Sequence, residues 1–83
     1  MKVVAVGRLD DIRGFALAGV ETVRCETLQD AGAMVQALSA DASIGLILLP
    51  ASCAAAASAA IGLVRGQRRA PVILELPHVD ADH

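Results

Sequence analysis

Aromatic residues are almost absent from this chain, which has no tryptophan, no tyrosine and a single phenylalanine, Phe15. The core therefore has to be built from Val, Leu, Ile and Ala. We expect Phe15 to lie in that core, because its ring can bury more apolar area than any other side chain here. With 83 residues the chain forms one domain with a thin margin of stability. We therefore expect the fold to depend strongly on this one ring.

Positive charge is also scarce. The chain has one lysine, Lys2, and a net charge of −2. Nucleic-acid binding needs clustered Lys and Arg, so this composition argues against a nucleic-acid partner. One small basic group, formed by Arg65, Arg68 and Arg69, follows an expected helix. That position favours a solvated helix end that complements the helix dipole over a phosphate site.

Cysteine is limited to Cys25 and Cys53, which form neither a C-x-x-C pair nor a disulfide framework. No basic-then-apolar leader precedes the first strand pattern. We therefore expect both thiols to be reduced, in the cytoplasm. Because no motif positions a histidine to activate either thiol, we expect them to be structural rather than nucleophiles or metal ligands.

The stretch from Ala42 to Val64 has no charged residue and is long enough to span a bilayer. Only Ile44–Leu49 is strongly apolar, however, and Pro50 interrupts the run before Ala, Ser and Gly fill most of the rest. A buried strand, a turn and a small-residue helix explain this pattern better than a membrane span.

Strand and helix patterns alternate along the chain. We expect strands over Lys2–Val6, Val20–Cys25, Ser43–Leu49 and Val72–Leu76, and helices over Asp11–Ala18, Thr27–Ala40 and Ala51–Arg65. This alternation predicts an α/β fold with right-handed crossovers and a four-stranded parallel sheet. The expected layout is flavodoxin-like, with strand order 2-1-3-4 and helices on both faces. Residues 1–77 form this domain, and 78–83 are expected to be a frayed tail.

Three local signals define the ends of the expected helices. Asp10 and Asp11 can cap the first helix and complement its dipole. Thr27 followed by Asp30 is a weak form of the capping box and opens the second helix. Gly66 lies just past the end of the third helix, as expected for a helix stop.

The motifs of nucleotide and receiver chemistry are missing from the positions where this fold would need them. Gly7 and Gly14 do not make a G-x-G-x-x-G loop, and Lys2 is not in a P-loop. Pro50 occupies the place after the third strand where a phospho-receiver domain would carry its acceptor aspartate. We therefore expect no bound cofactor, no metal ion and no catalytic residue.

The most distinctive segment is Gly14-Phe15-Ala16-Leu17-Ala18-Gly19-Val20, in which two glycines enclose the only aromatic residue. Gly-Phe-x-Leu-Ala-Gly followed by a β-branched residue resembles the F subunit of the V-type (vacuolar/archaeal-type) ATPases. The resemblance is carried by Gly14, Phe15, Leu17, Ala18 and Gly19. It extends to the strand segments Met1–Gly7, Gly45–Leu49 and Pro71–Pro77.

This resemblance implies a non-catalytic subunit in the rotating central stalk of a V-type ATPase or ATP synthase. Such a protein would bind the coiled-coil shaft subunit and other subunits of the complex. It would help couple ATP hydrolysis or synthesis to the transport of protons or sodium ions. It would lie in the cytoplasm, peripheral to the membrane, and reach the membrane only through the complex.

The third expected helix, Ala51–Arg65, has no charged residue from Ala51 through Val64. Small residues are tolerated in helices, so this composition can be structurally neutral, but it also suits close packing against a partner helix. Under the second interpretation the candidate contact residues are Ala54, Ala57, Ala60 and Ile61.

Two other functions stay open from the residues alone. One is a receiver-like interaction or signalling module that lacks the phospho-acceptor aspartate. The other is a small enzyme or thiol-dependent sensor that uses Cys53.

Overall fold

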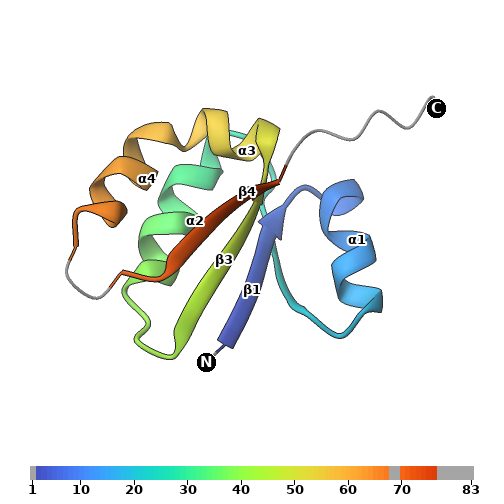
Figure 1. The fold of residues 1–83 in the computed structure, drawn as a ribbon. Helices are drawn as coiled ribbons and strands as arrows, with labels where there is room; N and C mark the ends of the chain where they lie inside the picture. The colour runs from blue at the N-terminus through green and yellow to red at the C-terminus, as the bar shows by residue number, and fades with distance from the viewer. Residues whose placement is uncertain (1, 68–69, 77–83) are drawn as a thin grey trace.

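Strands and helices alternate along residues 2–67 and 70–76, the part of the chain that the computed structural model describes (Figure 1). The elements are β1 (Lys2–Gly7), α1 (Leu9–Leu17), β2 (Glu21–Arg24), α2 (Asp30–Ser39), β3 (Ile44–Pro50), α3 (Ala51–Ala56), α4 (Ser58–Arg65) and β4 (Val72–Leu76). Each strand lies within one residue of its expected bounds at either end. The expected tail, 78–83, and Pro77, Arg68 and Arg69 lie outside the described residues.

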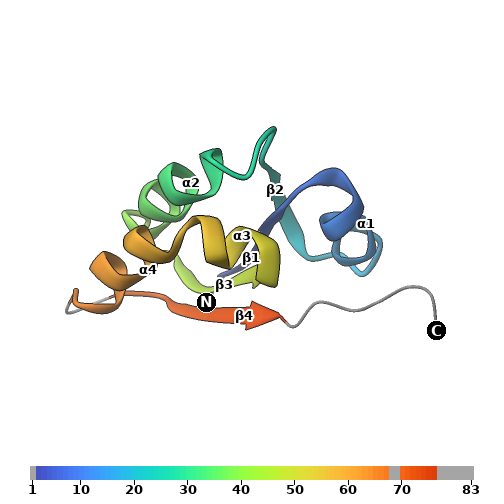
Figure 2. The same cartoon turned by 90° about the horizontal axis from the view of Figure 1, so that it is seen from above.

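The four strands form one parallel sheet with the order β2-β1-β3-β4. This confirms the α/β flavodoxin-like fold, with β2 at an edge and β3 in a central position. Right-handed crossovers place α1 on one face and α2, α3 and α4 on the other, as Figure 2 shows from above. Helices therefore lie on both faces, but unequally.

The main core lies between the sheet and the three helices α2, α3 and α4. Val4, Ile47 and Ile73 are aligned across β1, β3 and β4, and all three are buried. Val35 of α2 and Val64 of α4 face the same core. Aliphatic side chains thus supply this interior, in agreement with the composition.

A β-bulge brings two isoleucines of β3 into this core. Lys2 pairs with Ile44 but Val3 pairs with Leu46, so Gly45 is an extra residue in β3. Side chains normally alternate between the faces of a strand, and the inserted residue resets that alternation. Ile44 and Ile47 consequently point into the same core, although they are three positions apart.

Helix α2 begins at Asp30, three residues later than expected. The predicted capping pair does form one bond, in which the Thr27 N–H donates to the Asp30 carboxylate at 3.3 Å. In front of the helix, however, the N–H groups of Asp30 and Ala31 donate to the carbonyls of Thr27 and Leu28, three residues back. This tighter turn precedes the α-helix and shortens it.

The single helix expected over Ala51–Arg65 is wrong, because the segment divides into α3 and α4 at Ala57. Ala57 has φ −101° and ψ 12°, outside helical geometry. Hydrogen bonds still run from the Ala57 N–H to the Cys53 carbonyl and from the Ile61 N–H to the Ala57 carbonyl, each at 2.9 Å. The chain therefore bends at Ala57 without losing these two bonds.

Phe15 does not lie in the core as expected. Its side chain is partly exposed and it is not among the buried hydrophobic residues. On the α1 face, Ile12 and Ala5 are the buried residues instead. The reason is that Phe15 sits near the end of a short helix that packs chiefly on β1 and β2.

We predict that Ile47→Ala destabilises the protein more than Phe15→Ala. Ile47 is fully buried in a central strand, so its truncation should cost about 3–4 kcal/mol. Phe15→Ala should cost about 2 kcal/mol, because part of the ring is already in water. Chemical denaturation of both variants measures these costs. A larger loss of unfolding free energy for Phe15→Ala than for Ile47→Ala would contradict this prediction and show that the ring is a main part of the core.

Candidate functional site

The glycine-bounded segment forms the end of α1 and the turn that follows it. The Val20 N–H donates to the Phe15 carbonyl at 2.9 Å, and the Gly19 N–H donates to the Ala16 carbonyl at 3.1 Å. These two bonds constitute a Schellman motif, which needs its C′ residue in the left-handed region. That residue is Gly19, with φ 86°. The segment is therefore a helix stop that directs the chain into β2.

The other members of the segment have different environments. Phe15 and Val20, both partly buried, occupy the two positions at which a Schellman motif commonly brings apolar side chains together. Gly14 lies within α1, has no positive φ, and an added Cβ there would meet nothing within 4 Å. Leu17 is 85% exposed and Ala18 is also exposed. Leu17 is thus available to a partner, and Gly14 is not required by sterics.

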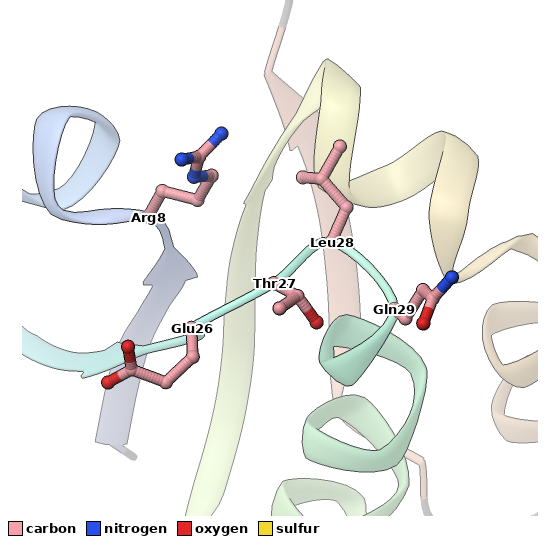
Figure 3. Close-up of a pocket in the computed structure, with 5 residues that line it drawn as sticks. All are labelled: Arg8, Glu26, Thr27, Leu28 and Gln29. Atoms are coloured by element: carbon pink, nitrogen blue, oxygen red, sulfur yellow. The ribbon is translucent and has the colours of Figure 1, made fainter.

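The carboxyl end of the sheet, where doubly wound folds bind ligands, holds an open hollow of about 450 Å³. Figure 3 shows the five lining residues: Arg8, Glu26, Thr27, Leu28 and Gln29. The Arg8 guanidinium and the Glu26 carboxylate point in opposite directions in this view. Glu26 also lies 4.0 Å from Arg24 in an exposed ion pair. The charged groups of the hollow do not converge on one ligand position.

Two thiols meet beside this hollow. Cys25 follows β2 and Cys53 lies in α3, and their Sγ atoms are 4.0 Å apart in the buried interior. Burial, together with the neighbouring Cys53, raises the pKa of the Cys25 thiol to about 11. Cys25 is therefore protonated at neutral pH, which disfavours it as a nucleophile. Within the described residues, no three His, Cys, Asp or Glu side chains form a cluster suited to a metal ion.

The four residues expected to contact a partner face the protein's own interior. Ala54, Ala57, Ala60 and Ile61 are all buried. A Cβ added to Gly32 of α2 would lie 3.6 Å from the Ala60 Cβ, so the two helices approach closely at this point. The small residues thus serve packing between α2 and α4 within the chain, which corrects our interpretation of this face as a candidate contact surface.

An exposed apolar surface lies on the opposite face of the sheet. It consists of Leu46 and Leu48 of β3 and Val72 and Leu74 of β4, which we call the open strip. Leu46 pairs with Val72 and Leu48 pairs with Leu74, so the four side chains form two adjacent rows. Val72 is 65% and Leu74 48% exposed, whereas Leu46 and Leu48 are partly buried. Helix α1 packs on β1 and β2 and leaves this half of the face without a covering helix in the described part of the chain (Figure 2).

The open strip was not predicted from the sequence, although the strand order contains the signal for it. Strand order 2-1-3-4 sends only the first crossover to the α1 face, and a single short helix cannot cover four strands. The apolar residues that alternate with buried ones are then left partly exposed on β3 and exposed on β4.

Comparison with known families decides the identity. The family model described as ATP synthase (F/14-kDa) subunit matches residues 3–83, almost the whole chain. The chain belongs to this family. This confirms the resemblance to the F subunit of the V-type ATPases. A search of curated proteins gave no match.

As a member of this family of F subunits, the chain is part of a rotary ATPase and associates with other subunits of that assembly. Among the described residues, no helix is both long and apolar enough to cross a bilayer. The Schellman segment, the thiol pair and the open strip are the features of this F subunit that require explanation.

We predict opposite effects of alanine at the two glycines of the Schellman segment. Gly19→Ala forces a side chain into the left-handed region and should cost about 1–2 kcal/mol. Gly14→Ala replaces a helical glycine without a clash and should stabilise by up to about 1 kcal/mol. Thermal denaturation of both variants tests this. Equal destabilisation by both would mean that Gly14 has a steric role as well.

We predict that stability falls between about pH 9 and pH 11 because of Cys25. In this range the unfolded chain loses the thiol proton, whose ordinary pKa is 9.0, while the folded protein keeps it up to about 11. The folded state then binds more protons, so the free energy of unfolding decreases with pH, by on the order of 2 kcal/mol. Urea denaturation across this range should show the decrease. Cys25→Ala should remove most of it, and an unchanged slope would contradict the assignment.

Proposed function

We propose that this F subunit is a non-catalytic component of the central stalk, which binds the coiled-coil shaft and turns with it. In that position it helps couple ATP hydrolysis or synthesis to ion transport. It reaches the membrane only through the complex, from the cytoplasmic side. The match to the family over residues 3–83 is the observation that carries this proposal.

The open strip supports a helical partner. It consists of four aliphatic side chains, and it carries no ionisable group of its own. Exposed apolar patches on small proteins commonly mark protein interfaces. A helix of the shaft protein that lies along β3 and β4 would bury this surface beside α1. Leu17, at the end of α1, is a further exposed apolar residue on the α1 side of the sheet.

A mechanical role also suits the polar groups of the protein. In the hollow at the carboxyl end of the sheet, the side chains of Arg8 and Glu26 point away from each other in the view of Figure 3. General acid–base or phosphoryl chemistry needs groups that converge on one reacting atom. We therefore propose that the protein transmits force through apolar contacts and does not itself hydrolyse ATP.

We predict that Leu74→Glu weakens binding to the coiled-coil shaft at least about tenfold, the effect of about 1.4 kcal/mol. The change puts a charge in the open strip, and because Leu74 is 48% exposed the isolated protein should keep its fold. Co-purification and calorimetric titration with the shaft protein measure the effect.

Leu63→Glu is the matched control. Leu63 is 65% exposed and lies on α4, on the other face of the sheet. It should leave binding unchanged. Normal binding by Leu74→Glu together with lost binding by Leu63→Glu would place the interface on the helical face and overturn the proposed surface.

A further inference from the structure

Cys25 and Cys53 are brought together by elements that are distant in sequence. They are separated by 28 positions, yet their Sγ atoms are 4.0 Å apart and neither residue is more than 1% exposed. The proposed role in the stalk gives this pair no task. Two cysteines at this distance are a dithiol, which can carry chemistry that a single buried cysteine cannot.

The backbone holds both residues in place. The Cys25 N–H donates to the Gly7 carbonyl at the end of β1, at 2.9 Å. The Cys53 carbonyl accepts the Ala57 N–H at 2.9 Å, at the bend between α3 and α4. A disulfide requires the sulfurs to approach from 4.0 Å to about 2 Å. Rotation of the side chains and a small shift of the six-residue helix α3 can supply that approach, because the chain bends at Ala57.

We propose that Cys25 and Cys53 are a redox-sensitive dithiol, oxidised by peroxide to an intramolecular disulfide that links the end of β2 to α3. The linkage also fixes one end of the loop that lines the hollow at the carboxyl end of the sheet, since Glu26 directly follows Cys25. Oxidation thus changes the rigidity of this end of the molecule.

The chemistry balances with hydrogen peroxide as the oxidant. The thiolate of one cysteine attacks a peroxide oxygen, the O–O bond breaks, and hydroxide leaves and takes up a proton to form water. The second sulfur then attacks the sulfur of the resulting sulfenic acid and forms the S–S bond. The hydroxyl group of the sulfenic acid leaves and takes up the proton of the second thiol, which gives a second water. Two thiols and one peroxide give one disulfide and two waters. A dithiol reductant reverses the linkage by exchange.

Burial and proximity have separate consequences for this reaction. Burial of both thiols slows the first step, because peroxide reaches them only when the structure opens locally. Proximity speeds the second step, because the second sulfur is already 4.0 Å away. The disulfide therefore forms before the sulfenic acid can react with more peroxide.

The experiment treats the folded chain of 83 residues with hydrogen peroxide. The protein is then unfolded in denaturant that contains N-ethylmaleimide, which alkylates the free thiols so that mass spectrometry can count them. We expect loss of both thiols and a monomer on a non-reducing gel. Cleavage after Glu26, which separates the two cysteines, should leave the peptides joined until reductant is added. Cys25→Ala and Cys53→Ala are matched controls, and neither can form the linkage.

The melting temperature provides a second measurement. A bridge between residues 28 positions apart should raise it by roughly 10 °C, and reductant should restore the original value. Two free thiols after peroxide treatment, disulfide-linked dimers, or oxygen added to the cysteines without a linkage would each overturn the proposal. None of these results bears on shaft binding, which the open-strip variants test separately.

Discussion

The parallel pairing of β1 with both β2 and β3 determines the rest of this molecule. Because β1 is flanked on both sides, the chain must cross the sheet in one direction after β1 and in the other direction after β2 and β3. Right-handed crossovers then assign one helix to one face and three to the other. This asymmetry explains the aliphatic core under α2, α3 and α4. It also explains why no helix of residues 2–67 covers the apolar rows on β3 and β4.

The strands could be predicted closely from the sequence, because each is a short apolar or β-branched run with a clear boundary. Gly7 ends β1, Pro50 ends β3, and Pro71 precedes β4. The bend at Ala57 could not be predicted in this way, since it lies in a run of alanines that contains no local helix breaker. It occurs where α2 approaches closely through Gly32, and such tertiary contacts leave no signal in local propensity.

The site was only partly predictable for a related reason. The segment around Phe15 is distinctive in the sequence. The residue that determines its conformation, however, is Gly19, whose positive φ allows the helix to end. Composition also could not orient the alanine-rich stretch, because alanine and serine differ too little in hydropathy to distinguish an inner from an outer face. The spacing of Ala54, Ala57 and Ile61 is that of a core-facing stripe, and all three are buried. The proximity of the two cysteines depends on the whole sheet, and only the structure establishes the distance.

The two faces of the sheet differ in how many helices cover them. The face under α2, α3 and α4 holds the main core, and the face under α1 keeps exposed apolar side chains that a partner could cover. The core under three helices is filled by side chains of this chain itself. The Arg65 side chain also donates to the Ile73 carbonyl at 3.2 Å, which occupies a backbone acceptor on the edge strand β4 and limits pairing there with other strands. No helix of the described residues covers the open strip, and its apolar side chains leave water only when another surface packs on them. If the partner binds there as proposed, and binds only the folded form, its binding free energy adds to the thin stability of the small domain, and assembly and stability are then coupled through β3 and β4.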